Sequence, residues 1–187
     1  MIQGQESQLD QLLAERDNNS QTIINVDEPV IKLVIFKLAA QCFAFLGTGI
    51  IEVISGDEKV YFLPGMPASV EGVINGRGDI ESVISLQSLL NLSSAFDNNA
   101  LNSTAAAHSS ILLGRGQLLK GKPMRSGLRV DQLIDVVDVP ASDLQQPPDA
   151  LPEHWRPFVL NLLVFNGLPV TVLDIDAVFA TWLKEQD

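Results

Sequence analysis

The sequence predicts a mainly β protein with a few short helices. Short apolar runs alternate with turn signals along the chain, as at 30–38 (VIKLVIFKL) and 158–173 (FVLNLLVFNGLPVTVL), and this alternation is typical of β-strands joined by hairpins. One strand–turn–strand unit also occurs twice, and each copy runs into a segment with helical spacing. Together these observations indicate a fold built from repeated β-hairpins.

The other strand candidates share the same short apolar pattern. In chain order they are CFAFLG (42–47), GIIEVI (49–54, or a short helix), the strand-rich sequence that continues from there to Leu86, SILLG (110–114) and SGLRVDQLIDVVDV (126–139). Leucine spacing predicts a helix over 86–92. A C-terminal amphipathic helix is predicted by the i, i+3, i+4, i+7 pattern of Ile175, Val178, Phe179 and Trp182. Polar or Pro-rich composition predicts loops at 93–110 and 145–152.

The repeat becomes visible when residues 82–90 (SVISLQSLL) are placed over residues 171–179 (TVLDIDAVF), at an offset of 89. Apolar positions match almost throughout. The same offset aligns Gly78 with Gly167, so that each copy reads strand, Gly turn, strand and helix. The sequence therefore predicts that one structural unit is used twice.

The joints of the two copies carry matching chemistry. Ser85 and Asp174 align where a strand meets a helix, and both are good N-caps because their side-chain oxygens accept hydrogen bonds from the first helical turn. Asn166-Gly167 is a strong signal for a type I′ hairpin turn. The corresponding stretch 75–79, with two glycines around Arg77, predicts a longer turn.

Composition excludes several classes of function. The chain has 187 residues, 46% of them apolar, which is enough for a core without disulfides. A net charge of −11 disfavours nucleic acid as a partner, because an acidic protein repels phosphate backbones. The lone Cys42 cannot form an internal disulfide, is typical of a reducing cytoplasm, and is expected to be a buried small hydrophobe. We therefore expect a cytoplasmic protein.

The N-terminal residues 1–28 are interpreted as a polar leader, either a frayed tail or a short docking helix. They lack the cationic start and apolar core of a secretory signal. The apolar run at 33–54 is long enough to cross a membrane, but Lys37 and Glu52 would then lie in or near lipid. Two buried strands explain this run better, so no direct membrane insertion is expected.

No residue pattern indicates an enzyme. The only histidines are His108, in a Ser-rich stretch, and His154, and no Cys/His spacing suggests a metal site. The chain contains no Gly-x-Ser-x-Gly, Walker-type or dinucleotide fingerprint. We therefore expect no catalytic residues, cofactor or metal.

The tripeptide Arg77-Gly78-Asp79 could suggest cell adhesion, which requires an extracellular protein. The chain shows no secretory signal and no disulfides, and Asp79 is predicted to begin a strand. We interpret the tripeptide as a hairpin Arg-Gly followed by an incidental Asp.

The stretch 63–90 (LPGMPASVEGVINGRGDIESVISLQSLL) resembles the core signature of the CheW family, the coupling proteins of bacterial chemotaxis. The signature Gly-Val-Ile-Asn-x-Arg-Gly lies at 72–78. Residues 126–139 resemble the family's second block, and 166–179 (NGLPVTVLDIDAVF) its closing block. The blocks occur in the right order, and the resemblance covers about residues 30–183.

The resemblance implies a fold of two SH3-like β-barrels with about five strands each, intertwined over residues 29–187 and packed together. It implies no catalysis. CheW-like proteins are adaptors that bind the regulatory domain of a CheA-type histidine kinase and the cytoplasmic tip of chemoreceptors. The implied function is therefore non-enzymatic coupling of receptors to the kinase.

The resemblance also implies a set of partner-binding residues. The receptor-facing candidates are Ile50, Glu52, Gly72 and Arg77, supported by Val73 and Asn75. The second block adds three residues near the expected junction of the barrels, namely Gly127, Val130 and Asp131.

Three positions depart from the family pattern. Gly76 replaces an apolar residue that is often Leu, and Ser82 replaces a Pro. Ser85 replaces an Asp but can keep the helix cap, whereas Gly76 should loosen the hairpin turn. The polar leader and the expanded loop at 93–110 suggest a divergent member of the family. They leave open an alternative, a CheW-like adaptor of a pilus-motility or other chemotaxis-like pathway that binds only one of the two partners.

Overall fold

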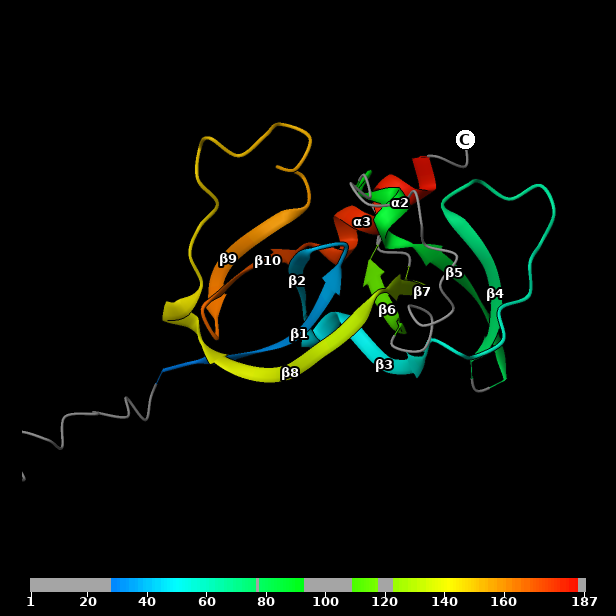
Figure 1. Cartoon of the computed structure of the whole chain (residues 1–187), viewed down its shortest axis with the longest axis horizontal. Helices are drawn as coiled ribbons and strands as arrows, with labels where there is room; N and C mark the ends of the chain where they lie inside the picture. Colours follow the sequence, from blue (N-terminus) through cyan, green and yellow to red (C-terminus); the bar gives the residue numbers. More distant parts are fainter. Residues whose placement is uncertain (1–27, 77, 93–108, 118–122, 185–187) are drawn as a thin grey trace, which may run out of the picture.

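The computed structural model describes residues 28–76, 78–92, 109–117 and 123–184 (Figure 1). The predictions for the leader at 1–27, for most of the loop at 93–110 and for Arg77 lie outside these ranges. Within them the chain forms two five-stranded sheets, which Figure 1 shows as two halves lying next to each other, with helices above their junction. The predicted mainly β fold is confirmed.

The first sheet has the strand order β8-β1-β2-β10-β9. Its strands are β1 Val30–Leu38, β2 Gln41–Leu46, β8 Gln132–Pro140, β9 Val159–Phe165 and β10 Leu168–Leu173. The second sheet has the order β3-β6-β7-β5-β4. Its strands are β3 Ile50–Ser55, β4 Val70–Gly76, β5 Asp79–Ser85, β6 Ser110–Gln117 and β7 Pro123–Val130. The helices are α2 Leu86–Leu89 and α3 Ile175–Lys184, with short 3₁₀ turns η1 Gly47–Gly49 and η3 Ala141–Asp143.

The two sheets interleave along the chain. The first sheet takes β1 and β2 from the N-terminal part and β8 to β10 from the C-terminal part, while the second sheet is built from the strands between them. Each sheet contains one parallel pair, β2 with β10 and β5 with β7, and its other pairs are antiparallel. Reading the two strand orders side by side, β8 therefore corresponds to β3, β1 to β6, β2 to β7, β10 to β5 and β9 to β4.

The predicted repeat is confirmed at residue level. β4 and β9 are 89 residues apart at both ends, and α2 and α3 begin at that same offset. An isolated bridge pairs Tyr61 with Val73 of β4, and another pairs Gln145 with Leu162, which lies 89 residues after Val73. The prediction of a longer first turn was wrong. Gly76 pairs with Asp79 just as Phe165 pairs with Leu168, so both hairpins have two-residue loops.

The predicted helix caps are also confirmed. The Ser85 hydroxyl accepts a hydrogen bond from the Ser88 amide at 3.3 Å. The Asp174 carboxylate accepts from the amides of Asp176 at 2.9 Å and Ala177 at 3.3 Å. Both caps satisfy amides that the first helical turn leaves without a partner, which is why the chain turns from strand to helix at these two positions.

A hydrophobic cluster between the sheets holds them together. Phe36 and Phe45 stack at a centroid distance of 5.2 Å, and both are fully buried. β7 contributes Leu128 and Val130 to the same cluster, and α3 contributes Phe179. The opposite face of β1 is buried in a second cluster inside the first sheet. Because β1 is covered on both faces, its sequence is almost continuously apolar.

The apolar run at 33–54 forms β1, β2, η1 and most of β3. The interpretation as two buried strands is confirmed for β1 and β2, whereas the third strand, β3, has only half-buried and exposed residues. In the part of the chain that the structure describes, no helix is both long and apolar enough to cross a membrane. Cys42 in β2 packs against a core cluster as the predicted small hydrophobe, but it is partly buried where a buried side chain was expected.

Candidate partner-binding surfaces

The β4–β5 hairpin carries three of the predicted site residues in described positions. Asn75 is exposed, and its side-chain oxygen accepts a hydrogen bond from the Gly78 amide at 2.9 Å. Asn75 therefore fixes the position of Gly78 at the end of this hairpin. Val73 is half-buried and exchanges two backbone hydrogen bonds with Tyr61, at 2.8 and 2.9 Å. The side chain of Asn75 and the backbone of Val73 both shape this hairpin.

Gly72 has a steric role that sequence reasoning did not identify. A Cβ at this position would lie 2.3 Å from the Tyr61 carbonyl oxygen, and the backbone φ is +150°. A side chain would therefore prevent the close approach of Tyr61 to β4. Gly72 allows the connection between β3 and β4, residues 56–69, to add a short pairing to the edge of the sheet.

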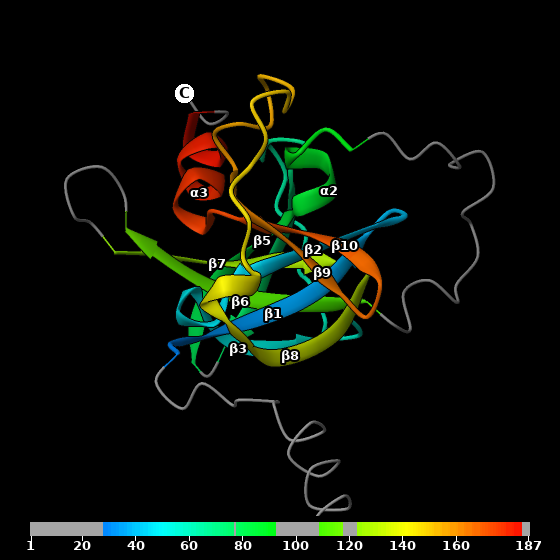
Figure 2. The same ribbon diagram turned by 90° about the vertical axis from the view of Figure 1, so that its left-hand side faces the viewer.

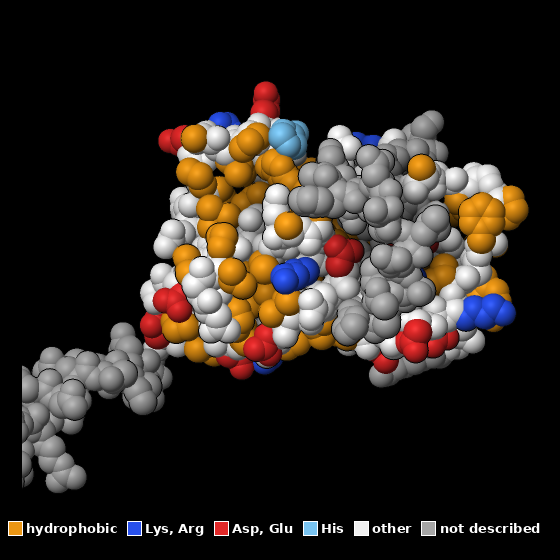
Figure 3. Space-filling model, viewed as in Figure 1, with side chains coloured by type: hydrophobic (Ala, Val, Ile, Leu, Met, Phe, Trp, Pro, Cys, Tyr) orange, Lys and Arg blue, Asp and Glu red, His pale blue; other side chains and the backbone are white. Residues whose placement is uncertain are grey.

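This connection exposes a group of large apolar side chains, called the loop patch below. Its members, with their exposed fractions, are Tyr61 (52%), Phe62 (73%), Leu63 (40%) and Met66 (38%). Figure 3 shows hydrophobic side chains gathered at the right-hand end of the molecule, where the connection runs. Contiguous exposed apolar surface of this kind marks interaction sites. The sequence signal was the run YFLPGMP, whose aromatic residues lie beside turn residues.

Ile50 and Glu52 lie in β3, at the opposite end of the strand order from β4. β6, β7 and β5 separate these residues from the hairpin, so the predicted receptor-facing set divides between two edges of one sheet. Both side chains are half-buried, while their neighbours Ile51 and Val53 are 43% and 40% exposed.

The first sheet has an equivalent edge. β8 occupies the place of β3 in its strand order, and it exposes Ile134 (36%) and Val136 (45%). Figures 1 and 2 both show β3 and β8 on the lower side of the molecule. We call Ile51, Val53, Ile134 and Val136 the edge-strand patch.

Residues of the second block lie at the crossing from β7 to β8. Val130 is fully buried in the cluster between the sheets, and Gly127 is buried in β7 between β5 and β6. The Asp131 amide donates to the Lys37 carbonyl at 3.0 Å, and its carboxylate accepts from the Ala39 amide at 2.6 Å. Asp131 thus ties the β7–β8 joint to the β1–β2 turn. Since Gly127 and Val130 are internal, they can affect a partner only by shaping the body beneath it.

Among the residues that the structure describes, no group of three or more His, Cys, Asp or Glu side chains could hold a metal ion. The polar groups near the candidate surfaces instead contact one another or the backbone, as Asn75 and Asp131 do. Exposed apolar side chains on a fixed β framework are suited to binding another protein.

A family model described as the CheW-like domain matches residues 32–181. The chain belongs to the CheW-like family. Two relatives are each named chemotaxis protein CheW. The protein from Rhizobium meliloti (strain 1021) is 27% identical over 123 residues, covering 66% of this chain and 71% of the relative. The protein from Treponema pallidum (strain Nichols) is 25% identical over 156 residues, covering 83% of this chain and 86% of the relative.

A solved structure agrees with the fold of this CheW-like protein. The scaffolding protein TtCheW from Thermoanaerobacter tengcongensis matches with a TM-score of 0.64 at 22% identity, covering 81% of this chain and 93% of that one. This likeness confirms the predicted architecture of two SH3-like, five-stranded subdomains packed together, with a C-terminal helix.

Proposed function

We propose that this CheW-like protein is a non-enzymatic cytoplasmic adaptor that couples chemoreceptors to a CheA-type histidine kinase. The observation that carries the proposal is the presence of two separate apolar surfaces, the loop patch and the edge-strand patch, on one body with a shared core. An adaptor needs two surfaces held in a fixed relation. The chemotaxis relatives support the same role.

The loop patch and the β4–β5 hairpin form the kinase-facing surface in this proposal. The hairpin members of the set that the resemblance implied to be receptor-facing are thereby reassigned to the kinase, because the strand order separates them from Ile50 and Glu52. The regulatory domain of CheA-type kinases is itself CheW-like, so binding would join the end of one barrel to the end of another. Phe62 and Tyr61 are the natural anchors, because exposed aromatic side chains carry much of the energy of protein interfaces. Gly72, Val73 and Asn75 act on this surface by shaping it.

The edge-strand patch forms the receptor-facing surface. Its four apolar side chains come from β3 and β8, one edge strand of each sheet, and Ile50 and Glu52 lie in the same strand β3. A receptor tip bound there would contact both subdomains at once. This arrangement gives the receptor and the kinase different sides of the second sheet, so both can bind together.

Titration calorimetry tests the proposal directly. Full-length protein is titrated with the regulatory domain of a CheA-type kinase from the same genome, and separately with the receptor tip. We expect saturable binding to both, with dissociation constants on the order of micromolar. Binding to one partner alone would favour the single-partner alternative. Binding to neither would contradict the coupling function and leave the fold assignment intact.

Replacing Arg77 by Ala is expected to weaken kinase binding by about 10-fold without unfolding the protein. In the sequence Arg77 stands between Gly76 and Gly78, where a turn tip is expected, so its loss should change the surface and not the core. Calorimetry gives the affinity and thermal unfolding gives the stability. A variant that unfolds would show that Arg77 has a structural role instead.

Replacing Phe62 by Ala is expected to weaken kinase binding by about 10-fold or more, because a central aromatic anchor contributes at least about 1–2 kcal/mol. Phe62 is 73% exposed, so stability should not change. Val164→Ala is the matched control, since Val164 is 67% exposed on the β9–β10 hairpin of the other subdomain. Equal losses in both variants would contradict the placement of the kinase on the loop patch.

A further inference from the structure

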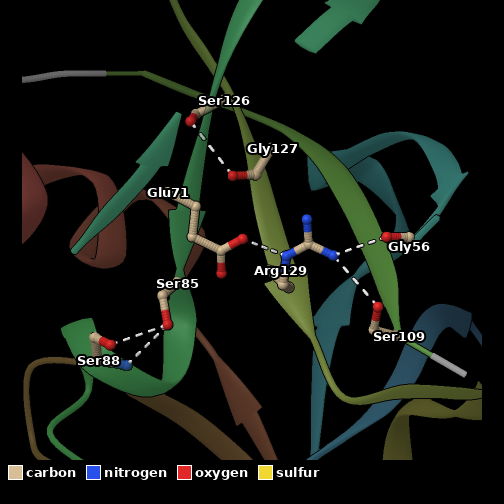
Figure 4. Close-up of polar contacts among 8 residues, drawn as sticks. All are labelled: Gly56, Glu71, Ser85, Ser88, Ser109, Ser126, Gly127 and Arg129. Atoms are coloured by element: carbon tan, nitrogen blue, oxygen red, sulfur yellow. Dashed lines mark hydrogen bonds and ion pairs between the residues drawn. The ribbon is translucent and has the colours of Figure 1, made fainter. Parts of the chain in front are cut away.

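Arg129 makes an unusual set of contacts for a residue of a central strand. It lies in β7, and Figure 4 shows its guanidinium between Glu71 on one side and Gly56 and Ser109 on the other. Its Nε pairs with the Glu71 carboxylate. Its Nη1 donates to the Gly56 carbonyl oxygen at 3.1 Å and to the Ser109 hydroxyl at 3.3 Å. The Arg129 and Glu71 side chains are only 22% and 30% exposed.

These contacts join the two edges of the second sheet. Gly56 directly follows β3, and Glu71 lies in β4 next to Gly72. β3 and β4 stand at opposite ends of the strand order, with Arg129 on the strand at its centre. Arg129 therefore contacts the first residue of the 56–69 connection and the strand that directly follows the connection.

The connection depends on a small number of such anchors. Between β3 and β4 it forms no regular helix or strand. Its anchors, besides Arg129, include the contacts of its first residues, Val60 packed on a core cluster, the Tyr61–Val73 bridge, a turn from Pro67 to Val70, and the Ser69 carbonyl, which accepts from the Ser85 amide at 2.8 Å. A connection of this length without secondary structure is normally mobile unless its ends are fixed. An arginine fits the task because its planar fork donates several hydrogen bonds in fixed directions.

The contribution of Arg129 to overall stability should be modest. A partly buried ion pair gains attraction but loses hydration, so the pair as a whole adds little to the free energy of folding, whereas removing Arg129 alone leaves the Glu71 carboxylate without this partner. The same contacts should matter more for the geometry of the 56–69 connection, because the loop patch can present its side chains together only when both ends of this connection are held in place. The contacts of Arg129 therefore point to positioning more than to global stability.

We infer that Arg129 is a positioning residue that fixes the loop patch in the shape that receives an apolar surface of a partner protein, the kinase regulatory domain. The inference rests on the proposed function for the identity of that partner. The positioning itself is a property of the free protein. It can therefore be tested with and without the partner.

The test compares Arg129→Met, Arg129→Lys and the control Arg125→Met in the full chain. Arg125 lies on the same strand and pairs with Glu81 at 2.9 Å and with Asp79 at 3.5 Å, both on β5 and neither in the 56–69 connection. We expect Arg129→Met to speed hydrogen exchange of the Gly56 and Tyr61 amides by about 10-fold or more. Amides in the central part of β6 should keep their protection. In Arg129→Met, kinase affinity should fall by about 10-fold, and Arg129→Lys should restore part of it. Arg125→Met should leave the exchange of the Gly56 and Tyr61 amides unchanged.

Three results would overturn the inference. Unchanged exchange at Gly56 and Tyr61 would show that other contacts hold the connection. Equal acceleration in β6 would show a general stability role. Faster exchange with unchanged affinity would show that the partner does not need the fixed shape. If Arg129→Met does not fold, Glu71→Gln removes the same ion pair at constant size and is read in the same way. If the wild-type protein binds no kinase domain, the proposed function fails while exchange still decides the positioning role.

Discussion

Replacing Phe45 by Ala is expected to lower the free energy of unfolding by about 3–5 kcal/mol and to weaken both sheets in one transition. Phe45 is fully buried and stacks on Phe36 in the cluster between the sheets. That cluster takes side chains from β1, β2 and β10 of the first sheet and from β5, β6 and β7 of the second. Because this cluster draws its side chains from both sheets, a cavity there should destabilise both.

Urea unfolding followed by circular dichroism and by tryptophan fluorescence measures this effect. Trp155 and Trp182 both contact the shared cluster, so their fluorescence reports the junction, while circular dichroism reports the strands. The control is Phe62→Ala, the same substitution at a residue that is 73% exposed, which should leave the midpoint unchanged. Two separate transitions in the Phe45 variant would mean that each subdomain folds independently, contrary to the shared core.

Local features of the fold could be predicted because the signals that encode them are local. Apolar alternation identified the strands, and aligning Ser85 with Asp174 located two helix caps that the structure contains. The offset of 89 between the hairpins followed from residues close together in sequence. Each of these features depends on neighbours within about one helical turn or one hairpin.

Features that depend on distant residues could not be predicted in this way. The parallel pairing of β2 with β10 joins strands more than a hundred residues apart, and no periodicity signals it. The division of Ile50 and Glu52 from the β4–β5 hairpin follows from strand order, which the family resemblance did not specify at residue level. The first hairpin turn was expected to be long because of its glycines, yet the cross-strand pair Gly76–Asp79 closes it at two residues.

Gly72, on the proposed partner-binding surface, is another residue whose role depends on a distant part of the chain and could not be predicted from the sequence. Its place in the Gly-Val-Ile-Asn-x-Arg-Gly signature suggested a contact with a partner, whereas the structure gives it a steric role toward Tyr61, eleven residues earlier. The sequence could identify the glycine but not the backbone that approaches it. For the same reason, the loop patch was not among the predicted site residues.

Replacing Gly72 by Ala is expected to displace the 56–69 connection and to reduce kinase binding by at least about 10-fold. The added Cβ would lie 2.3 Å from the Tyr61 carbonyl oxygen, and backbone cannot move aside as a flexible side chain can. The φ of +150° also disfavours any L side chain. Overpacking of this kind costs about 1–3 kcal/mol. Calorimetry with the kinase regulatory domain, together with hydrogen exchange at the Tyr61 amide, measures both consequences.

Gly76→Ala is the matched control for this substitution, because Gly76 lies in the same strand and is also buried. A Cβ there would meet its nearest neighbour, the Glu81 side chain, at 3.4 Å, which is ordinary contact. We therefore expect the Gly76 variant to keep both the Tyr61–Val73 hydrogen bonds and the affinity. If Gly72→Ala loses the hydrogen bonds but still binds the kinase, the connection is not part of the interface. If it keeps the bonds but loses binding, Gly72 contacts the partner directly, as its place in the family signature suggests.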